Sequence, residues 1–83
     1  MSGGYFDYNE MRLGHISKDI IYVISKNNEE DGFGFAEQTI NRLAIAAKLA
    51  VKIEKLIQCV DYLLEGDYDE KDFTEEWSKV INE

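Results

Sequence analysis

The sequence predicts an all-α fold, a small helical bundle or hairpin in which one long central helix is flanked by two shorter helices. Apolar residues recur at three- and four-residue steps in three stretches, which is the spacing of one face of an α-helix. Clusters of glycine and polar residues separate these stretches at 2–4, 27–34 and 66–72. With only 83 residues, the chain is expected to form a single helical domain spanning 1–83.

The first helix is predicted to begin at Asp7. The Asp7 carboxylate can accept backbone N–H groups while Glu10, three residues later, reaches back as in a capping box. The segment 20–24 is β-branched and aromatic, and alone it would favour a strand. We predict a helix because the chain offers no second strand to pair with it. The apolar residues at helical spacing are Leu13, Ile16, Ile20 and Val23.

The central segment, from about Phe35 to Glu65, has the strongest helical pattern in the chain. Its apolar positions nearly surround the helix, so it must be covered on more than one side. We therefore expect a homo-oligomer, although tight packing within one chain explains the small alanines at 44, 46, 47 and 50 equally well. The main stripe consists of Ile40, Leu43, Ala47, Ala50, Ile53, Ile57, Val60 and Leu64.

A short final helix is predicted after Gly66, which stands where a left-handed residue commonly ends a helix. Asp72 or Thr74 can cap this last helix, and acidic residues in its first turn suit the positive end of the helix dipole. Its apolar stripe consists of Phe73, Trp77 and Ile81.

The charge of the chain argues against direct binding of nucleic acid. Seventeen acidic residues against nine basic ones give a net charge of −8, whereas binding a phosphate backbone requires clustered cations. The charge is uneven: residues 61–83 carry nine acids and two bases, a net −7, and residues 32–60 carry two acids and four bases, a net +2. The acidic excess therefore lies at one end of the sequence.

Cysteine usage and hydropathy favour the cytoplasm. Cys59 is the only cysteine, which excludes a disulfide within the chain and suits a reducing compartment. The first residues lack the basic and apolar segments of a secretory signal. No apolar run approaches the roughly 18–20 residues of a membrane span, so we expect no membrane association.

The residues that could support catalysis are few. His15 is the only histidine, and Cys59 lies among apolar residues where a thiol is usually an inert packing unit. We therefore predict that the protein is not an enzyme, with no catalytic residues and no cofactor.

A metal site is also not expected. Asp67, Asp69 and Asp72 are oxygen ligands of the kind that hard cations prefer. If Asp67 were the first position of a calcium loop, however, Asp72 would occupy the glycine position and Ser78 the bidentate glutamate position. The glycines in 27–34 likewise lack the Gly-Lys-Ser or Gly-Lys-Thr that completes a phosphate loop.

Two stretches of the sequence have a distinctive composition. The first, Ser-Gly-Gly-Tyr-Phe-Asp-Tyr, spans 2–8 with Arg12 a few residues later, and the second, Asp-Tyr-Leu-Leu-Glu-Gly-Asp, spans 61–67 and continues to Glu70 and Phe73. Together they resemble a family of small uncharacterised bacteriophage and prophage proteins. Members typically begin Ser-Gly-Gly-aromatic-Phe-Asp-Tyr and finish with an Asp-aromatic-Leu, a Gly-Asp and an acidic turn. An arginine often precedes the aspartate in that family, where this chain has Val60. The resemblance implies a phage origin and the bacterial host cytoplasm as its setting.

Phage accessory proteins of this size and charge are often aimed at a host component, so the resemblance implies an inhibitor of a host defence or nucleic-acid-processing protein. The expected partner is a host protein with a basic surface, because an acidic protein can compete for a groove that holds nucleic acid. The three aromatics ahead of the first helix are expected to be core or interface residues. The predicted protein-binding residues are Glu65, Asp67, Asp69, Glu70, Asp72, Glu75, Glu76, Tyr5, Phe6 and Tyr8.

Two other functions fit the sequence. One is a helical homo-oligomer that sequesters a small signalling nucleotide, and the other is a phage structural or regulatory subunit. The nucleotide function needs cations beside aromatics, and the candidate cations are Arg12, Lys18, Lys48, Lys52 and Lys55.

Overall fold

The computed structural model describes residues 4–83 and contains α1 (Met11–Ser25), α2 (Glu37–Glu65) and α3 (Glu70–Ile81). The prediction of an all-α fold with a long central helix between two shorter ones is confirmed, and the described residues contain no strand. The β-branched segment 20–24 lies inside α1.

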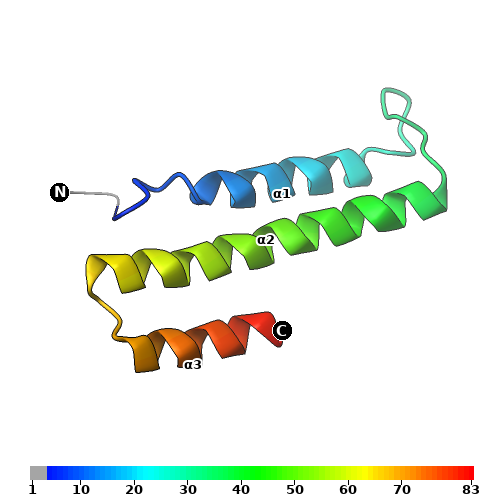
Figure 1. Cartoon of the computed structure of the whole chain (residues 1–83). Helices are drawn as coiled ribbons and strands as arrows, with labels where there is room; N and C mark the ends of the chain where they lie inside the picture. Colours follow the sequence, from blue (N-terminus) through cyan, green and yellow to red (C-terminus); the bar gives the residue numbers. More distant parts are fainter. Residues whose placement is uncertain (1–3) are drawn as a thin grey trace.

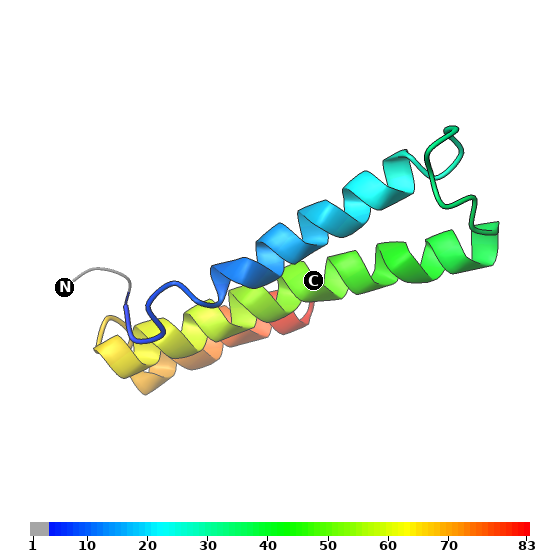
Figure 2. The same ribbon diagram turned by 90° about the horizontal axis from the view of Figure 1, so that it is seen from above.

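The three helices form a layer one helix thick. Helix α1 packs along one side of α2 and α3 packs along the other (Figure 1), and within residues 4–83 helices α1 and α3 do not touch. The extents of the molecule are 50 × 29 × 11 Å. Seen from above, α1 crosses α2 at a slant and α3 runs behind α2 (Figure 2). Both broad faces of α2 are therefore left without a covering helix.

The start of the first helix differs from the prediction. Asp7 and Tyr8 have positive φ values of 57° and 64°, so they form a turn, and α1 begins only at Met11. Glu10 occupies the N-cap position but its side chain makes no capping hydrogen bond. The predicted capping box is wrong because residues 4–6 are held by a contact with α2, described below, that the local sequence does not encode.

Helix α2 ends where the sequence predicts, but the N-cap of α3 is a different residue from those predicted. Gly66 ends α2 in the left-handed conformation, with φ 86°, as the sequence predicts. Asp69 is the N-cap of α3, and its carboxylate accepts a hydrogen bond of 2.8 Å from the N–H of Asp72. Asp72 and Thr74 are therefore not the caps, because α3 begins at Glu70 and both residues lie inside its first turns.

Helices α1 and α2 meet through small residues. Ser17 and Ala47 are each only 2% exposed, and the Ser17 hydroxyl donates a 2.8 Å hydrogen bond to the Ala47 carbonyl. At Gly14, an added Cβ would lie 2.9 Å from the Glu54 carboxylate, so a larger residue would require the Glu54 side chain to move. Small side chains at these positions allow the two backbones to approach closely.

The loop between α1 and α2 is closed by one buried asparagine. The Asn27 amide nitrogen donates to the Phe35 carbonyl at 2.9 Å, and its oxygen accepts from the Phe35 N–H at 2.8 Å. Phe33 and Phe35 stack with ring centroids 5.0 Å apart and are exposed. An added Cβ at Gly32 would lie 1.9 Å from the Lys26 carbonyl oxygen, so this closure requires glycine there.

The hydrophobic core is small. Among residues 4–83, Ala47 and Cys59 are the only fully buried apolar side chains, while many large apolar side chains stay exposed. No helix within these residues is long and apolar enough to cross a membrane.

Candidate binding surfaces

Asp61 joins the N-terminal segment to the end of α2. This residue lies in the last turns of α2 and is buried. Its Oδ1 accepts a hydrogen bond from the Tyr5 N–H and another of 3.3 Å from the Phe6 N–H. A carboxylate that accepts two backbone N–H groups is a charge-assisted anchor, and it holds residues 4–6 beside the C-terminal end of α2 (Figure 1).

Glycine is required at position 4 for two reasons. Gly4 has φ 70°, a conformation that L side chains rarely adopt, and an added Cβ would lie 2.4 Å from Asp61 Oδ2. Residues 4–6 of the stretch 2–8 are therefore in contact with Asp61 of the stretch 61–67. Residues 2 and 3 lie outside the described part of the chain.

The predicted protein-binding residues gather at and near this end of the molecule. The acidic members are exposed, except for the half-buried Glu76, and they run from the end of α2 through the turn and along α3. Tyr5 and Tyr8 are exposed, and the half-buried Phe6 packs edge-to-face against Tyr5 with ring centroids 5.2 Å apart. We call this set, Tyr5 to Tyr8 together with Glu65 to Glu76, the acidic end.

Two residues next to the acidic end are not among the predicted binding residues. Asp61 is the anchor, and an acid within the otherwise apolar run Val60 to Leu64 is a signal for a buried, partnered carboxylate. Tyr62 is exposed, and its ring lies 5.1 Å from the Tyr68 ring. Tyr62 therefore adds a further aromatic ring to this surface.

A shallow hollow lies beside the acidic end. Phe6, Leu13 and Ile57 supply its apolar lining, and Glu10 and Arg12 also border it. Glu10 is only 7% exposed, and its Oε1 is buried without a hydrogen-bond donor in the described structure. A buried hydrogen-bond acceptor without a donor costs free energy. The Glu10 carboxylate is therefore an energetically unfavourable group at the border of this hollow.

The residues that could have formed a catalytic pair differ in their surroundings. His15 is exposed on α1, whereas Cys59 is buried on α2. Burial raises the pKa of the Cys59 thiol, and the negative charge of Glu76 raises it further. The thiol is therefore protonated at neutral pH and is a poor nucleophile.

We expect Cys59 to react with iodoacetamide at pH 7.5 at least about tenfold more slowly than a free thiol, because both its burial and its raised pKa deplete the thiolate. Reaction rates followed by mass spectrometry, with and without urea, test this. Replacing Glu76 with glutamine removes the second cause and should speed the reaction. Equal rates in folded and unfolded protein would contradict this prediction.

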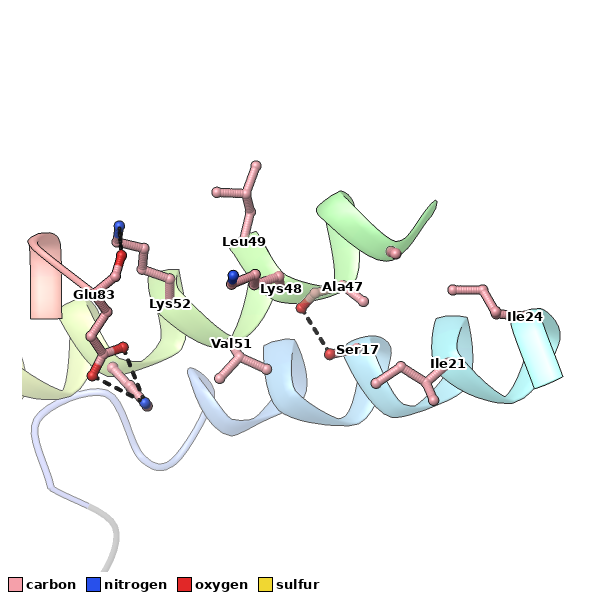
Figure 3. A pocket seen from close by; sticks show the side chains of 11 residues that line it. Ser17, Ile21, Ile24, Ala47, Lys48, Leu49, Val51, Lys52 and Glu83 are labelled. Carbon is pink, nitrogen blue, oxygen red and sulfur yellow. Dashed lines mark hydrogen bonds and ion pairs between the residues drawn. The ribbon is translucent and has the colours of Figure 1, made fainter. Parts of the chain in front are cut away.

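A groove of about 520 Å³ lies between α1 and the middle of α2. Its apolar lining includes Ile21, Ile24 and Val51, and three lysines border it (Figure 3). The structure therefore brings together three of the five cations predicted for nucleotide binding, whereas Arg12 borders the hollow and Lys18 does not line the groove. The three lysines are Lys48, Lys52 and Lys55.

Glu83 binds two of these lysines. The Lys55 ammonium lies 3.2 Å from Glu83 Oε1, and the Lys52 ammonium donates to the Glu83 carbonyl at 3.4 Å (Figure 3). An anion already occupies one side of the groove, so a second anion must share these lysines or displace Glu83.

Asp67, Asp69 and Asp72 do not form a metal centre in this structure. Within residues 4–83 no three histidine, cysteine, aspartate or glutamate side chains converge as a metal-binding group. The Asp69 carboxylate instead caps α3.

Comparisons of the chain with protein-family models, with curated proteins and with solved structures found no match.

Proposed function

We propose that this chain is a non-enzymatic binding protein, a phage-derived inhibitor whose acidic end occupies the cationic surface of a host defence or nucleic-acid-processing protein in the bacterial cytoplasm. The observation that carries the proposal is the Asp61 anchor, which holds the exposed Tyr5 at the end of α2 from which the α2–α3 turn and its exposed acids continue. A protein surface that normally binds nucleic acid is cationic, so an acidic surface complements it.

The two components of the acidic end have different roles. Residues 65–76 contain seven acids and one lysine, a net charge of −6, which attracts and orients a cationic partner. Exposed tyrosines supply apolar contact area and a hydroxyl, and aromatic residues of this kind dominate binding energy at protein interfaces. The charges therefore govern the association rate and the tyrosines govern the lifetime of the complex.

Charge reversal at the acidic end tests the proposal. The immobilised chain is used to capture proteins from bacterial lysate, and the wild type is compared with the triple variant Asp67→Lys, Glu70→Lys and Glu75→Lys. These three residues are exposed, and Asp69 is left intact because it caps α3. We expect the variant to lose the captured proteins, and about 0.5 M salt to release them from the wild type through screening.

A matched control uses the acids of the α1–α2 loop: Glu29→Lys, Glu30→Lys and Asp31→Lys. Each triple variant changes the net charge by +6, from −8 to −2, and all three control residues are exposed. The control should retain the captured proteins. If both variants lose them equally, net charge and not the acidic end is responsible, and the proposal fails.

The second candidate function, a homo-oligomer that sequesters a small signalling nucleotide, is supported by the three lysines that border the groove, although the described residues that line it include no aromatic. A ligand that binds only the folded state raises its melting temperature. A thermal-shift screen with cyclic nucleotides, repeated on Lys48→Glu, tests this function. A shift in the wild type that the variant lacks would support it, and no shift with any nucleotide would reject it.

A further inference from the structure

A stripe of apolar residues on α2 remains exposed or only half-buried between the two neighbouring helices. Its spacing alternates four, three, four, three and four residues, so two positions repeat every seven residues, as in the seam of a coiled coil. None of its six members is fully buried, and Ile53 and Leu64 are 45% and 49% exposed. The seam consists of Ala46, Ala50, Ile53, Ile57, Val60 and Leu64.

The seam lies on the opposite side of the layer from the groove. Val51 lines the groove, and Ile53, two residues later, is rotated about 200° from it around the helix axis. Ile57 lies in the hollow with Leu13 of α1, which places that hollow on the seam side. The three lysines of α2 therefore border the groove on one broad face, and the seam lies on the other.

The surface of the isolated chain is larger than that of a typical folded monomer of this mass. A folded monomer of 9.6 kDa exposes about 5,100 Å², whereas this chain exposes 6243 Å². The excess of about 1,100 Å² exceeds the roughly 800 Å² that each partner buries in a standard interface. The radius of gyration, 16.2 Å, is likewise above the roughly 12 Å of a compact domain of this length.

We infer that two copies of this chain pack seam to seam in antiparallel orientation, forming a symmetric dimer through the apolar face of α2. Shape favours this orientation. The first half of the seam is small and the second half is bulky, so antiparallel pairing sets Ala46 opposite Leu64 and Ala50 opposite Val60. Ile53 of each copy then lies opposite Ile57 of the other, beside the two-fold axis.

Charge favours the same orientation. A parallel dimer would place two segments of net charge −7 side by side, and like charges repel. The antiparallel dimer instead sets residues 61–83 of each copy beside residues 32–60 of the other, which carry net +2. Arg42, four residues before the seam, then lies near the acidic end of the second copy.

The antiparallel dimer also covers the exposed edge of α2. Helix α3 runs beside only the second half of α2 (Figure 1), so Ile45 and Leu49 in the first half are 58% and 50% exposed. Figure 3 shows Leu49 pointing away from α1. With the copies antiparallel, α3 of each copy lies over the half of α2 that the other copy's α3 leaves bare.

Analytical ultracentrifugation of the purified chain tests the dimer. We expect a mass twice that of the 9.6 kDa chain. In Ile53→Glu two charges would meet beside the two-fold axis, so the dissociation constant should rise at least about 100-fold. The control is Ile21→Glu, an equal substitution at a residue 54% exposed on the groove side, which should stay dimeric.

A wild type that sediments as one chain at all concentrations, or an Ile53→Glu variant that stays dimeric, overturns the inference. If Ile53→Glu unfolds, the melting temperature of the wild type decides: dimerisation requires that it rise with protein concentration, and a constant value rejects the dimer.

Cysteine crosslinking tests the orientation. Ala46→Cys and Leu64→Cys are made separately in a Cys59→Ser background and mixed under mild oxidation. The antiparallel dimer predicts a disulfide between position 46 of one copy and position 64 of the other, and none between two copies of Ala46→Cys. Efficient crosslinking of Ala46→Cys to itself would overturn the antiparallel arrangement.

Discussion

Replacing Asp61 with alanine is expected to lower the free energy of unfolding by about 2–3 kcal/mol and to release residues 4–8 from α2. The Asp61 carboxylate accepts both the Tyr5 and Phe6 N–H groups from a buried position. A hydrogen bond to a charged group contributes about 1.5–3 kcal/mol. The expected loss is less than two such bonds because the freed N–H groups regain water.

Two variants bracket this effect. Asp61→Asn keeps one acceptor oxygen and should lose less stability than the alanine variant, whereas Asp67→Ala removes an exposed carboxylate and should change stability by less than about 0.5 kcal/mol. Urea unfolding gives the free energies, and limited proteolysis reports release of the N-terminal segment. If Asp61→Ala and Asp67→Ala behave alike, the anchor has no energetic role.

Replacing Ala47 with leucine is expected to cost about 3 kcal/mol, which is a large part of the roughly 4–12 kcal/mol available to a domain of this length. Ala47 is 2% exposed and its carbonyl accepts the Ser17 hydroxyl, so three added carbons must push α1 away and strain that hydrogen bond. A shift of the urea midpoint, together with reduced helix content by circular dichroism, would report the separation.

The control for this prediction is Ala44→Leu. Ala44 lies one turn earlier, is exposed and lines the groove, where a larger side chain has room. Its stability should change by less than about 0.5 kcal/mol. A similar loss in both variants would mean that leucine is poorly tolerated along this side of α2 in general, and that close packing at Ala47 is not the cause.

The sequence predicts the helices well because they depend on local spacing. The three- and four-residue repeat of α2 extends over many turns, and Gly66 ends that helix as expected. The start of α1 could not be predicted in the same way, because the turn at Asp7 and Tyr8 follows from a contact with Asp61, more than 50 residues away in the chain.

The N-cap of α3 is predicted about one helical turn too late, and the reason lies in the local sequence. Several acids stand between Gly66 and Phe73, and each could cap a helix. In the structure Asp69 is the cap, since α3 begins at Glu70, four residues after the left-handed Gly66. The sequence could not distinguish Asp69 from Asp72, since both are followed by residues with similar helix propensity.

The candidate surfaces likewise combine features that follow from the local sequence with features that depend on long-range contacts. Exposure of the acids could be read from the polar pattern, whereas the position of Tyr5 at the end of α2 depends on a long-range hydrogen bond. The groove likewise depends on how α1 and α2 cross, which places Ile21 near Val51. Neither arrangement has a local signature.

The missing contact between α1 and α3 affects how the chain opens. Each outer helix is stabilised only by its interface with α2, so the stability of the isolated chain is close to a sum of two nearest-neighbour terms. Local opening of α3 then leaves the α1–α2 pair intact, and amide hydrogen exchange in α3 should proceed without global unfolding. The α1–α2 pair, joined through Ser17 and Ala47, would exchange last.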